Sequence, residues 1–225
     1  FNLDHQFVGA YTTSIERTGD VHQLGLSYRI PVYRAGGVVG ASFTRSSVVG
    51  NYGAFTSTGA GQTVGLNYSH YLPPDGGYRS YVTLALDDKR YDITEISGVA
   101  VPGQQVRRSR PLTLTYAARV ERNTAIWGYN VDLSHNLSGG SGNSLAAYQS
   151  EDPRITTARF TALRANANYL GSMGDGWLWS ARGQFQYSAD ALIAGEQLGL
   201  GGASSVRGTS ERPISGDRGL FVSME

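Results

Sequence analysis

Apolar and polar residues alternate with a period of two from one end of this chain to the other. In the segment Leu24–Val32, one face would carry Leu24, Leu26, Tyr28, Ile30 and Val32, and the other Gly25, Ser27 and Arg29. The segments Leu112–Val120, Ala125–Leu133 and Trp177–Tyr187 repeat this pattern. Because successive strand residues point to opposite faces, each segment predicts a β-strand with one apolar and one polar face. No segment shows convincing helical periodicity.

Weaker alternation extends this pattern over most of the remaining chain. It occurs in Asp4–Ser14, Val38–Ser46, Thr63–Tyr71, Tyr78–Asp88 and Thr157–Leu170, and it begins again at Leu220. Together these segments predict an all-β protein with ten strands.

The connections between these strands alternate in length. Four are short turns, at 31–37, 73–77, 121–123 and 171–176. The others are longer and centre on 16–20, 49–61, 89–110, 138–154 and 195–219. In an antiparallel up-and-down sheet, every second connection lies at the same end. Short turns at one end and long loops at the other are typical of a transmembrane β-barrel of the outer-membrane type.

The composition of the polar faces favours this fold over a soluble sandwich or a lipocalin-like barrel. Those folds need an apolar interior, whereas here the polar faces consist of Gly, Ser, Thr, Asn and Gln with occasional Arg. Such a face suits a water-filled lumen. Aromatic residues near strand ends are candidates for the membrane-interface girdles: Tyr71, Tyr78, Trp177 and Trp179. No apolar run approaches the ~20 residues of a transmembrane helix.

Charge and residue usage exclude several function classes. The chain has 19 Lys+Arg, 18 Asp+Glu and no cysteine, so nothing indicates nucleic-acid binding, disulfides or a thiolate metal site. Its four histidines lack metal-ligand spacing. Ser134 and His135 are adjacent on one strand and would point to opposite faces, which argues against a catalytic pair. We expect no enzyme activity, no cofactor and no metal.

The ends of the sequence suggest a piece of a longer protein. The first residues do not resemble a signal peptide, there is no initial methionine, and Glu225 falls within an alternating segment.

The stretch 195–219 is the longest departure from the strand pattern. It is rich in glycine and polar residues, so we expect neither strand nor helix in it. At its centre, Val206-Arg207-Gly208 places one cation between a β-branched residue and a glycine. Another glycine-rich stretch, Gly139–Asn143, is expected to be a flexible solvated loop tip.

The central tripeptide and its flanks closely resemble the GGxxSVRG(F/Y)…GDxG signature of the two-partner secretion transporters, the hemolysin-activator-like branch of the outer-membrane assembly and translocation superfamily. The matching residues are Gly201, Gly202, Val206, Arg207, Gly208, Gly216, Asp217 and Gly219. The segment Gly25–Tyr33 is also similar to that family, less distinctively. Thr209 departs from the family, which has an aromatic residue at this position.

This resemblance implies a specific place for each part of the chain. Residues 1–225 would form part of a sixteen-stranded barrel, from its third to its twelfth strand. Residues 195–219 would be the sixth extracellular loop, folded into the lumen. Arg207 would anchor this loop to an acidic residue on a later strand, absent from this sequence, and Gly202 and Gly208 would allow a close approach to the wall.

The function implied by the resemblance is export of a large exoprotein, such as an adhesin or hemolysin, through the barrel lumen in the Gram-negative outer membrane. The expected partners are this exoprotein and outer-membrane lipid. Three alternatives remain open at this point: a barrel of the same superfamily that inserts or assembles membrane proteins, a barrel hydrolase, and a passive porin.

Overall fold

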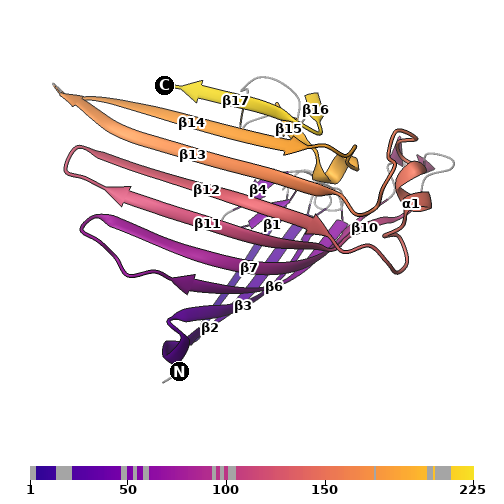
Figure 1. The fold of residues 1–225 in the computed structure, drawn as a ribbon, viewed down its shortest axis with the longest axis horizontal. Helices are drawn as coiled ribbons and strands as arrows, with labels where there is room; N and C mark the ends of the chain where they lie inside the picture. Colours follow the sequence, from indigo (N-terminus) through magenta and orange to yellow (C-terminus); the bar gives the residue numbers. More distant parts are fainter. Residues whose placement is uncertain are drawn as a thin grey trace.

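The computed structural model describes residues 4–13, 22–46, 50–52, 55–57, 61–92, 95–96, 99–100, 105–174, 176–201, 205 and 214–225. Ten strands lie side by side in chain order and form one antiparallel sheet (Figure 1). This arrangement confirms the ten-stranded up-and-down fold. The strands are β1 (Gln6–Thr13), β2 (His22–Val32), β3 (Gly37–Ser46), β6 (Gly61–Tyr71), β7 (Tyr78–Tyr91), β11 (Pro111–Glu121), β12 (Ala125–Asn136), β13 (Thr161–Gly174), β14 (Trp177–Ser188) and β17 (Gly219–Met224).

Shorter elements occupy the connections. An eleventh strand, β10 (Arg107–Ser109), extends the sheet beside β7. Three small ribbons are formed by β4 (Gly50–Tyr52) with β5 (Phe55–Ser57), β8 (Glu95–Ile96) with β9 (Val99–Ala100), and β15 (Leu198–Leu200) with β16 (Ile214–Gly216). The helical pieces are η1 (Tyr33–Ala35), α1 (Leu145–Gln149) and η2 (Ala194–Glu196).

The short turns lie at one end of the sheet, as expected, and α1 lies at the opposite end (Figure 1). The boundaries of β13 differ most from those expected. β13 begins at Thr161, not Thr157, and continues to Gly174 through an irregularity between Ser172 and Gly174, so most of the expected 171–176 turn is strand. β13 begins later than expected because Phe160 is fully buried among loop residues and does not continue the sheet.

One face of the sheet is apolar across almost its whole width. The strand register places residues of like character opposite one another in a single row: Ile30, Val39, Tyr68, Leu84, Leu114, Leu133, Leu163 and Tyr187. Leu84, Leu114 and Leu133 are each 50% exposed. A continuous, exposed apolar row of this kind is the surface that a barrel presents to lipid.

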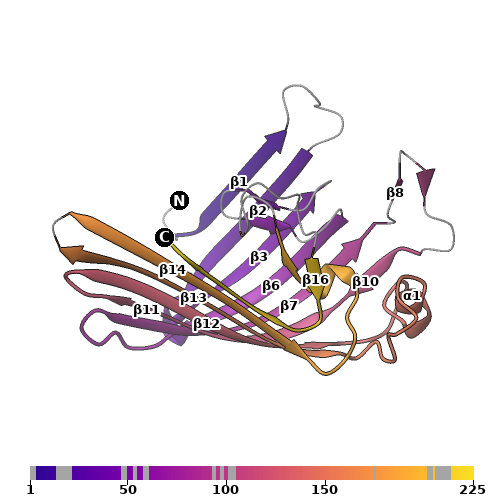
Figure 2. The ribbon, with the colours of Figure 1, turned by 90° about the horizontal axis from the view of Figure 1, so that it is seen from above.

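The other face is polar and is the concave side of the curved sheet (Figure 2). One of its rows runs through Ser69, Thr83, Thr115, Asp132, Arg164 and Gln186. Neighbours in this row bond across strands: the Ser69 and Thr83 hydroxyls lie 2.7 Å apart, and Thr115 donates to Asp132 over 2.6 Å. The expected wet inner face is therefore a hydrogen-bonded network.

Aromatic residues gather on the apolar face near the short turns. The Tyr78 hydroxyl forms hydrogen bonds with the hydroxyls of Tyr116 and Tyr129, and the ring centroids of Tyr169 and Trp179 lie 4.5 Å apart. Tyr71 was assigned to this girdle and does not belong to it. It pairs with Tyr81 on the concave face, and its hydroxyl accepts a hydrogen bond from Arg29 over 3.3 Å.

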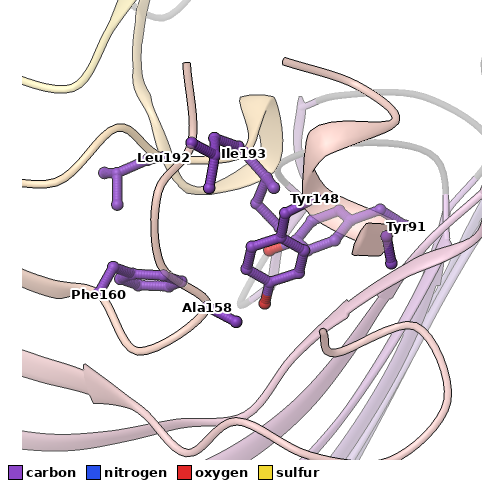
Figure 3. Packing of buried hydrophobic residues seen from close by; sticks show 8 residues of the cluster. Tyr91, Tyr148, Ala158, Phe160, Leu192 and Ile193 are labelled. Carbon is purple, nitrogen blue, oxygen red and sulfur yellow. The ribbon is translucent and has the colours of Figure 1, made fainter. Parts of the chain in front are cut away.

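The buried apolar core lies in the loops at the long-loop end of the sheet. Leu192 and Ile193, from the loop between β14 and β17, pack beside Tyr148 and Phe160, from the loop between β12 and β13 (Figure 3). The cluster also contains Tyr91, Ala147, Ile155 and Ala158. Among the described residues, no helix has the length and hydropathy needed to cross a membrane.

Candidate functional site

The loop between β14 and β17 (residues 189–218, hereafter the β14–β17 loop) begins and ends at one polar junction. Asp217, near its end, accepts hydrogen bonds through Oδ1 from the Leu192 backbone N–H over 2.8 Å and from Gln197 Nε2 over 3.1 Å. The Gln197 amide also donates to the Leu192 carbonyl oxygen over 3.1 Å. Asp217 therefore joins the two arms of the loop.

Within the first arm, η2 directs Glu196 into the concave face of the sheet. Lys89 Nζ, the Tyr91 hydroxyl and the Ser109 hydroxyl all donate to Oε1, at 3.1, 2.9 and 2.7 Å. Arg164 Nη2 donates to Oε2 over 2.9 Å. These four donors come from β7, β10 and β13, so one carboxylate joins the loop to three strands of the wall.

The backbone of Glu196 is held as well. Its carbonyl oxygen accepts from Arg164 Nη2 over 2.9 Å and from Gln186 Nε2 over 3.0 Å. The Glu196 side chain is 1% exposed. Both oxygens of this buried carboxylate accept hydrogen bonds, and two of the four donors are cations, so its burial is compensated.

The electrostatics of the site keep Glu196 ionised. Burial alone raises the pKa of its carboxyl, but the charges of Lys89 and Arg164 and the hydrogen bond from Ser109 outweigh burial and lower the pKa from 4.5 to about 2. At neutral pH the site is thus an ion cluster of one anion between two cations.

Two further contacts hold η2 in place. Gly195 lies against the Tyr91 ring: a Cβ at this position would be 2.2 Å from Tyr91 Cε1. Glu151, just after α1, accepts the Ala194 backbone N–H over 2.8 Å and pairs with Arg107 Nε over 2.6 Å. The β12–β13 loop therefore supports η2 of the β14–β17 loop.

Hydrogen bonds of a buried asparagine hold the β12–β13 loop in turn. Asn136 is fully buried, accepts the Arg110 N–H over 2.6 Å, and donates to the Asn143 side chain over 2.9 Å and to the Ala158 carbonyl over 2.6 Å. Asn143 is fully buried too, so the expectation of a solvated tip at Gly139–Asn143 was wrong at that residue. The carboxamide of Asn143 makes polar contacts that close a turn at this position.

Half of the motif residues lie in the described part of the loop. Gly201 has a φ of 123°, and its N–H donates to the Ser205 hydroxyl over 2.6 Å. Gly216 ends the β15–β16 ribbon, opposite Leu198, and Gly219 begins β17, where a Cβ would lie 3.0 Å from Leu198 Cδ2. Gly202, Val206, Arg207 and Gly208 lie outside the described residues, as does Thr209.

The expectation that 195–219 contains neither strand nor helix was wrong. Glu196 closes η2, and three residues on each arm pair as β15 and β16. The described parts of the loop lie on the concave side of the sheet (Figure 2), where Asp217 and the wall align the two arms. Tertiary contacts here override the low strand propensity of glycine and polar residues.

The sequence interpretation missed Glu196 and its partners on the wall. A signal was available: Arg164 is the single charged residue of its strand, and Glu196 is one of the few acidic residues of the facing loop. What the sequence could not give was their proximity, because Lys89 and Glu196 are 107 positions apart.

The serine and histidine that were weighed as a catalytic pair occupy opposite faces. Ser134 is buried and bonds to the Thr113 hydroxyl over 2.9 Å, whereas His135 bonds to the Thr161 hydroxyl on the apolar side. Over the described ranges, no three His, Asp or Glu side chains are grouped as a metal site would need.

Known proteins resemble this chain over its whole length. Residues 3–225 match the family described as "Haemolysin secretion/activation protein ShlB/FhaC/HecB". The outer membrane transporter CdiB of Dickeya dadantii (strain 3937) is 24% identical over 225 residues, which cover 97% of this chain and 39% of that protein.

Solved structures support the fold. CdiB from Escherichia coli superposes with a TM-score of 0.74 at 18% identity, over 99% of this chain and 41% of that chain. CdiB from Acinetobacter baumannii gives 0.66 at 17% identity, over 98% and 39%. The chain thus spans about two fifths of the length of these relatives. With the ten-stranded sheet, the apolar outer face and the match over residues 3–225, the chain belongs to the haemolysin secretion/activation family, the outer-membrane transporters of two-partner secretion.

Proposed function

We propose that this chain forms part of the wall of a conduit through which a large secreted protein crosses the outer membrane, and that the β14–β17 loop is a latch inside it. The Glu196 ion cluster carries this proposal. It joins the loop to the face of the sheet that a passing polypeptide would follow, and it does so through bonds that can break and re-form.

The concave face suits an extended client. Thr115, Asp132 and Arg164 are spaced across neighbouring strands and offer both donors and acceptors. An unfolded chain in transit exposes backbone N–H and C=O groups that need such partners, but tight binding would halt it. Folding of the client outside the cell would then bias its movement outward.

In this proposal, export requires the latch to release its hold on the wall. Glu196 would hold the base of the loop, and Arg207 would hold its tip against an acidic residue on a later strand, as the resemblance implies. A guanidinium is suited to that role because it stays charged when partly desolvated and can bind a carboxylate through two N–H groups. The segment 195–219 would be the moving part of this barrel domain.

The experiment is a secretion assay with the full-length transporter. A Gram-negative host would express it together with a candidate partner, chosen as a large secreted protein whose gene adjoins that of the transporter, and the amount of that partner in the medium would be measured with and without the transporter. We expect release only with the transporter and periplasmic retention without it.

The same cultures separate export from the membrane-protein assembly alternative. If the protein inserted other barrels, its loss would lower the amounts of unrelated outer-membrane barrels. Unchanged partner release without the transporter would refute the proposed function, and a general loss of outer-membrane barrels would favour assembly.

A further inference from the structure

The apolar face of the sheet ends in charged residues at the long-loop end. Along β7, the outward positions run Leu84, Leu86, Asp88 and Arg90, because every second residue shares a face. Leu86 and Arg90 are four residues apart, which is roughly 13 Å along a strand. The surface therefore changes from fully apolar to charged within that distance.

Neighbouring strands make the same change at the same level. Arg90 is directly opposite Gln62 on β6 and Arg108 on β10, and Gln62 is opposite Arg45 on β3. Three arginines and one glutamine thus form a single row across four strands. The strand register places these residues side by side, so their proximity does not depend on the conformations of the long side chains.

A fourth cation and two acids complete the patch. Arg110 Nε pairs with Asp88 over 3.0 Å, and Arg90 pairs with Asp92 over 3.4 Å. The side chains of Arg90 and Arg110 remain 43% and 36% exposed in these pairs. The four arginines, named here the basic border, are Arg45, Arg90, Arg108 and Arg110; with Asp88 and Asp92 they leave an excess of two positive charges.

We propose that the basic border binds the phosphate groups of a phosphorylated glycolipid in the outer leaflet of the outer membrane. The long loops of such barrels face the cell exterior, so the border lies at the level of that leaflet's headgroups. A guanidinium engages phosphate through two parallel N–H groups, and neighbouring arginines would share one phosphate. This inference depends on the membrane location and not on export.

The surface below the border identifies the occupant as a lipid. The next outward residues on β3 and β6 are Phe43 and Val64, both apolar, and on β7 Leu86 follows beyond Asp88. Val64 and Leu86 are 47% and 43% exposed. A molecule with acyl chains and a phosphate matches both parts at once. A soluble anion would match only the arginines, and an acidic protein segment would leave the apolar part uncovered.

The test uses the purified full-length protein in detergent and native mass spectrometry with lipid A as the probe. We expect bisphosphorylated lipid A to remain bound and dephosphorylated lipid A to bind much more weakly. The variant Arg45→Gln/Arg90→Gln/Arg108→Gln should weaken binding of the bisphosphorylated form by about tenfold or more, since each surface arginine contributes to headgroup attraction.

The matched control also removes three arginines from one row. Arg79 is opposite Arg119, and Gly128 and Asn168 continue that row to Arg182, on the concave face near the short turns. The variant Arg79→Gln/Arg119→Gln/Arg182→Gln should retain lipid A. Asp88→Asn should strengthen binding, because it frees both Arg110 and Arg108 from the same carboxylate; this gain does not depend on any loss of folding.

Three results would overturn the proposal. The first is equal binding by the wild-type protein and the border variant. The second is equal binding of phosphorylated and dephosphorylated lipid A, which would indicate acyl-chain contact alone. The third is an equal loss in the concave-face control, which would indicate a general effect of net charge.

Discussion

Arg164 Nη2 lies 2.9 Å from Glu196 Oε2 and also 2.9 Å from the Glu196 carbonyl oxygen. One nitrogen on the wall of the sheet thus holds both the side chain and the backbone of η2. Because both bonds depend on the same guanidinium, loss of Arg164 would loosen the side chain and the backbone of Glu196 together.

Glu196→Gln is expected to loosen the loop. The substitution keeps the shape but removes the charge between Lys89 and Arg164, and breaking a buried ion cluster in this way costs about 3 kcal/mol of docking free energy. Hydrogen exchange of the backbone at 192–200 in detergent should rise accordingly. Glu121→Gln, which disrupts an exposed pair with Arg119, is the control and should change exchange little. Equal hydrogen exchange at 192–200 in the Glu196→Gln and Glu121→Gln variants would show that Glu196 does not anchor the loop.

Docking of the loop should weaken in acid. The pKa of Glu196 is about 2 in the docked loop and 4.5 once the loop is released, so the released state binds the proton more readily. The contribution of Glu196 is complete above pH 4.5, and it is lost as the pH falls from 4.5 towards 2; in full it amounts to about 3 kcal/mol. Residues 1–225 have no cysteine, so a dye attached at Ser215→Cys, in a protein without other cysteines, would report release. The same dye on a Glu196→Gln background should show no transition in this pH range.

Much of the fold follows from local sequence, and the candidate site does not. Alternation in Leu112–Val120 or Ala125–Leu133 predicts a strand and its two faces, because neighbouring side chains alone determine the pattern. The contact of Glu196 with Lys89 depends instead on how far the whole sheet curves. That curvature accumulates over many strands, so the local sequence of one strand does not determine it.

The loop cluster shows the same limit. Phe160 falls in a segment expected to be strand, and Ile155 falls between that segment and the long loop centred on 138–154; both are fully buried in the cluster that contains Leu192 and Ile193. Their partners belong to a loop more than thirty positions away in the chain. Periodicity describes one element at a time and therefore assigned Phe160 to the wrong one.

Gly195→Ala should impair docking of the loop through sterics alone. The added methyl group would lie 2.2 Å from Tyr91 Cε1, so either the ring or η2 must move, at a cost of about 1–3 kcal/mol. Gly183→Ala provides the control, since the nearest atom to its new methyl group would be the Phe221 carbonyl oxygen at 3.9 Å. Exchange at 192–200 should increase only in the first variant. An increase of the same size in both would show that Gly195 has no special contact.

Asn136→Ala should release the β12–β13 loop. The substitution leaves the Arg110 N–H and the Ala158 carbonyl without the partners that Asn136 supplies, and unsatisfied buried groups of this kind cost about 1–3 kcal/mol each. Limited proteolysis within 137–160 should become faster while the barrel remains heat-modifiable. Asn166→Ala, at an exposed strand position, should leave the rate unchanged. An unaltered rate in the Asn136 variant would contradict its structural role.

Partner secretion by Arg207→Ala in the full-length transporter tests the central claim most directly. Arg218→Ala, in the same loop outside the VRG motif, is the control. The account predicts that the Arg207 variant inserts in the outer membrane and stays heat-modifiable, yet releases little or none of the partner, while the control secretes normally. Normal export by Arg207→Ala would contradict the assignment of this loop as the functional latch.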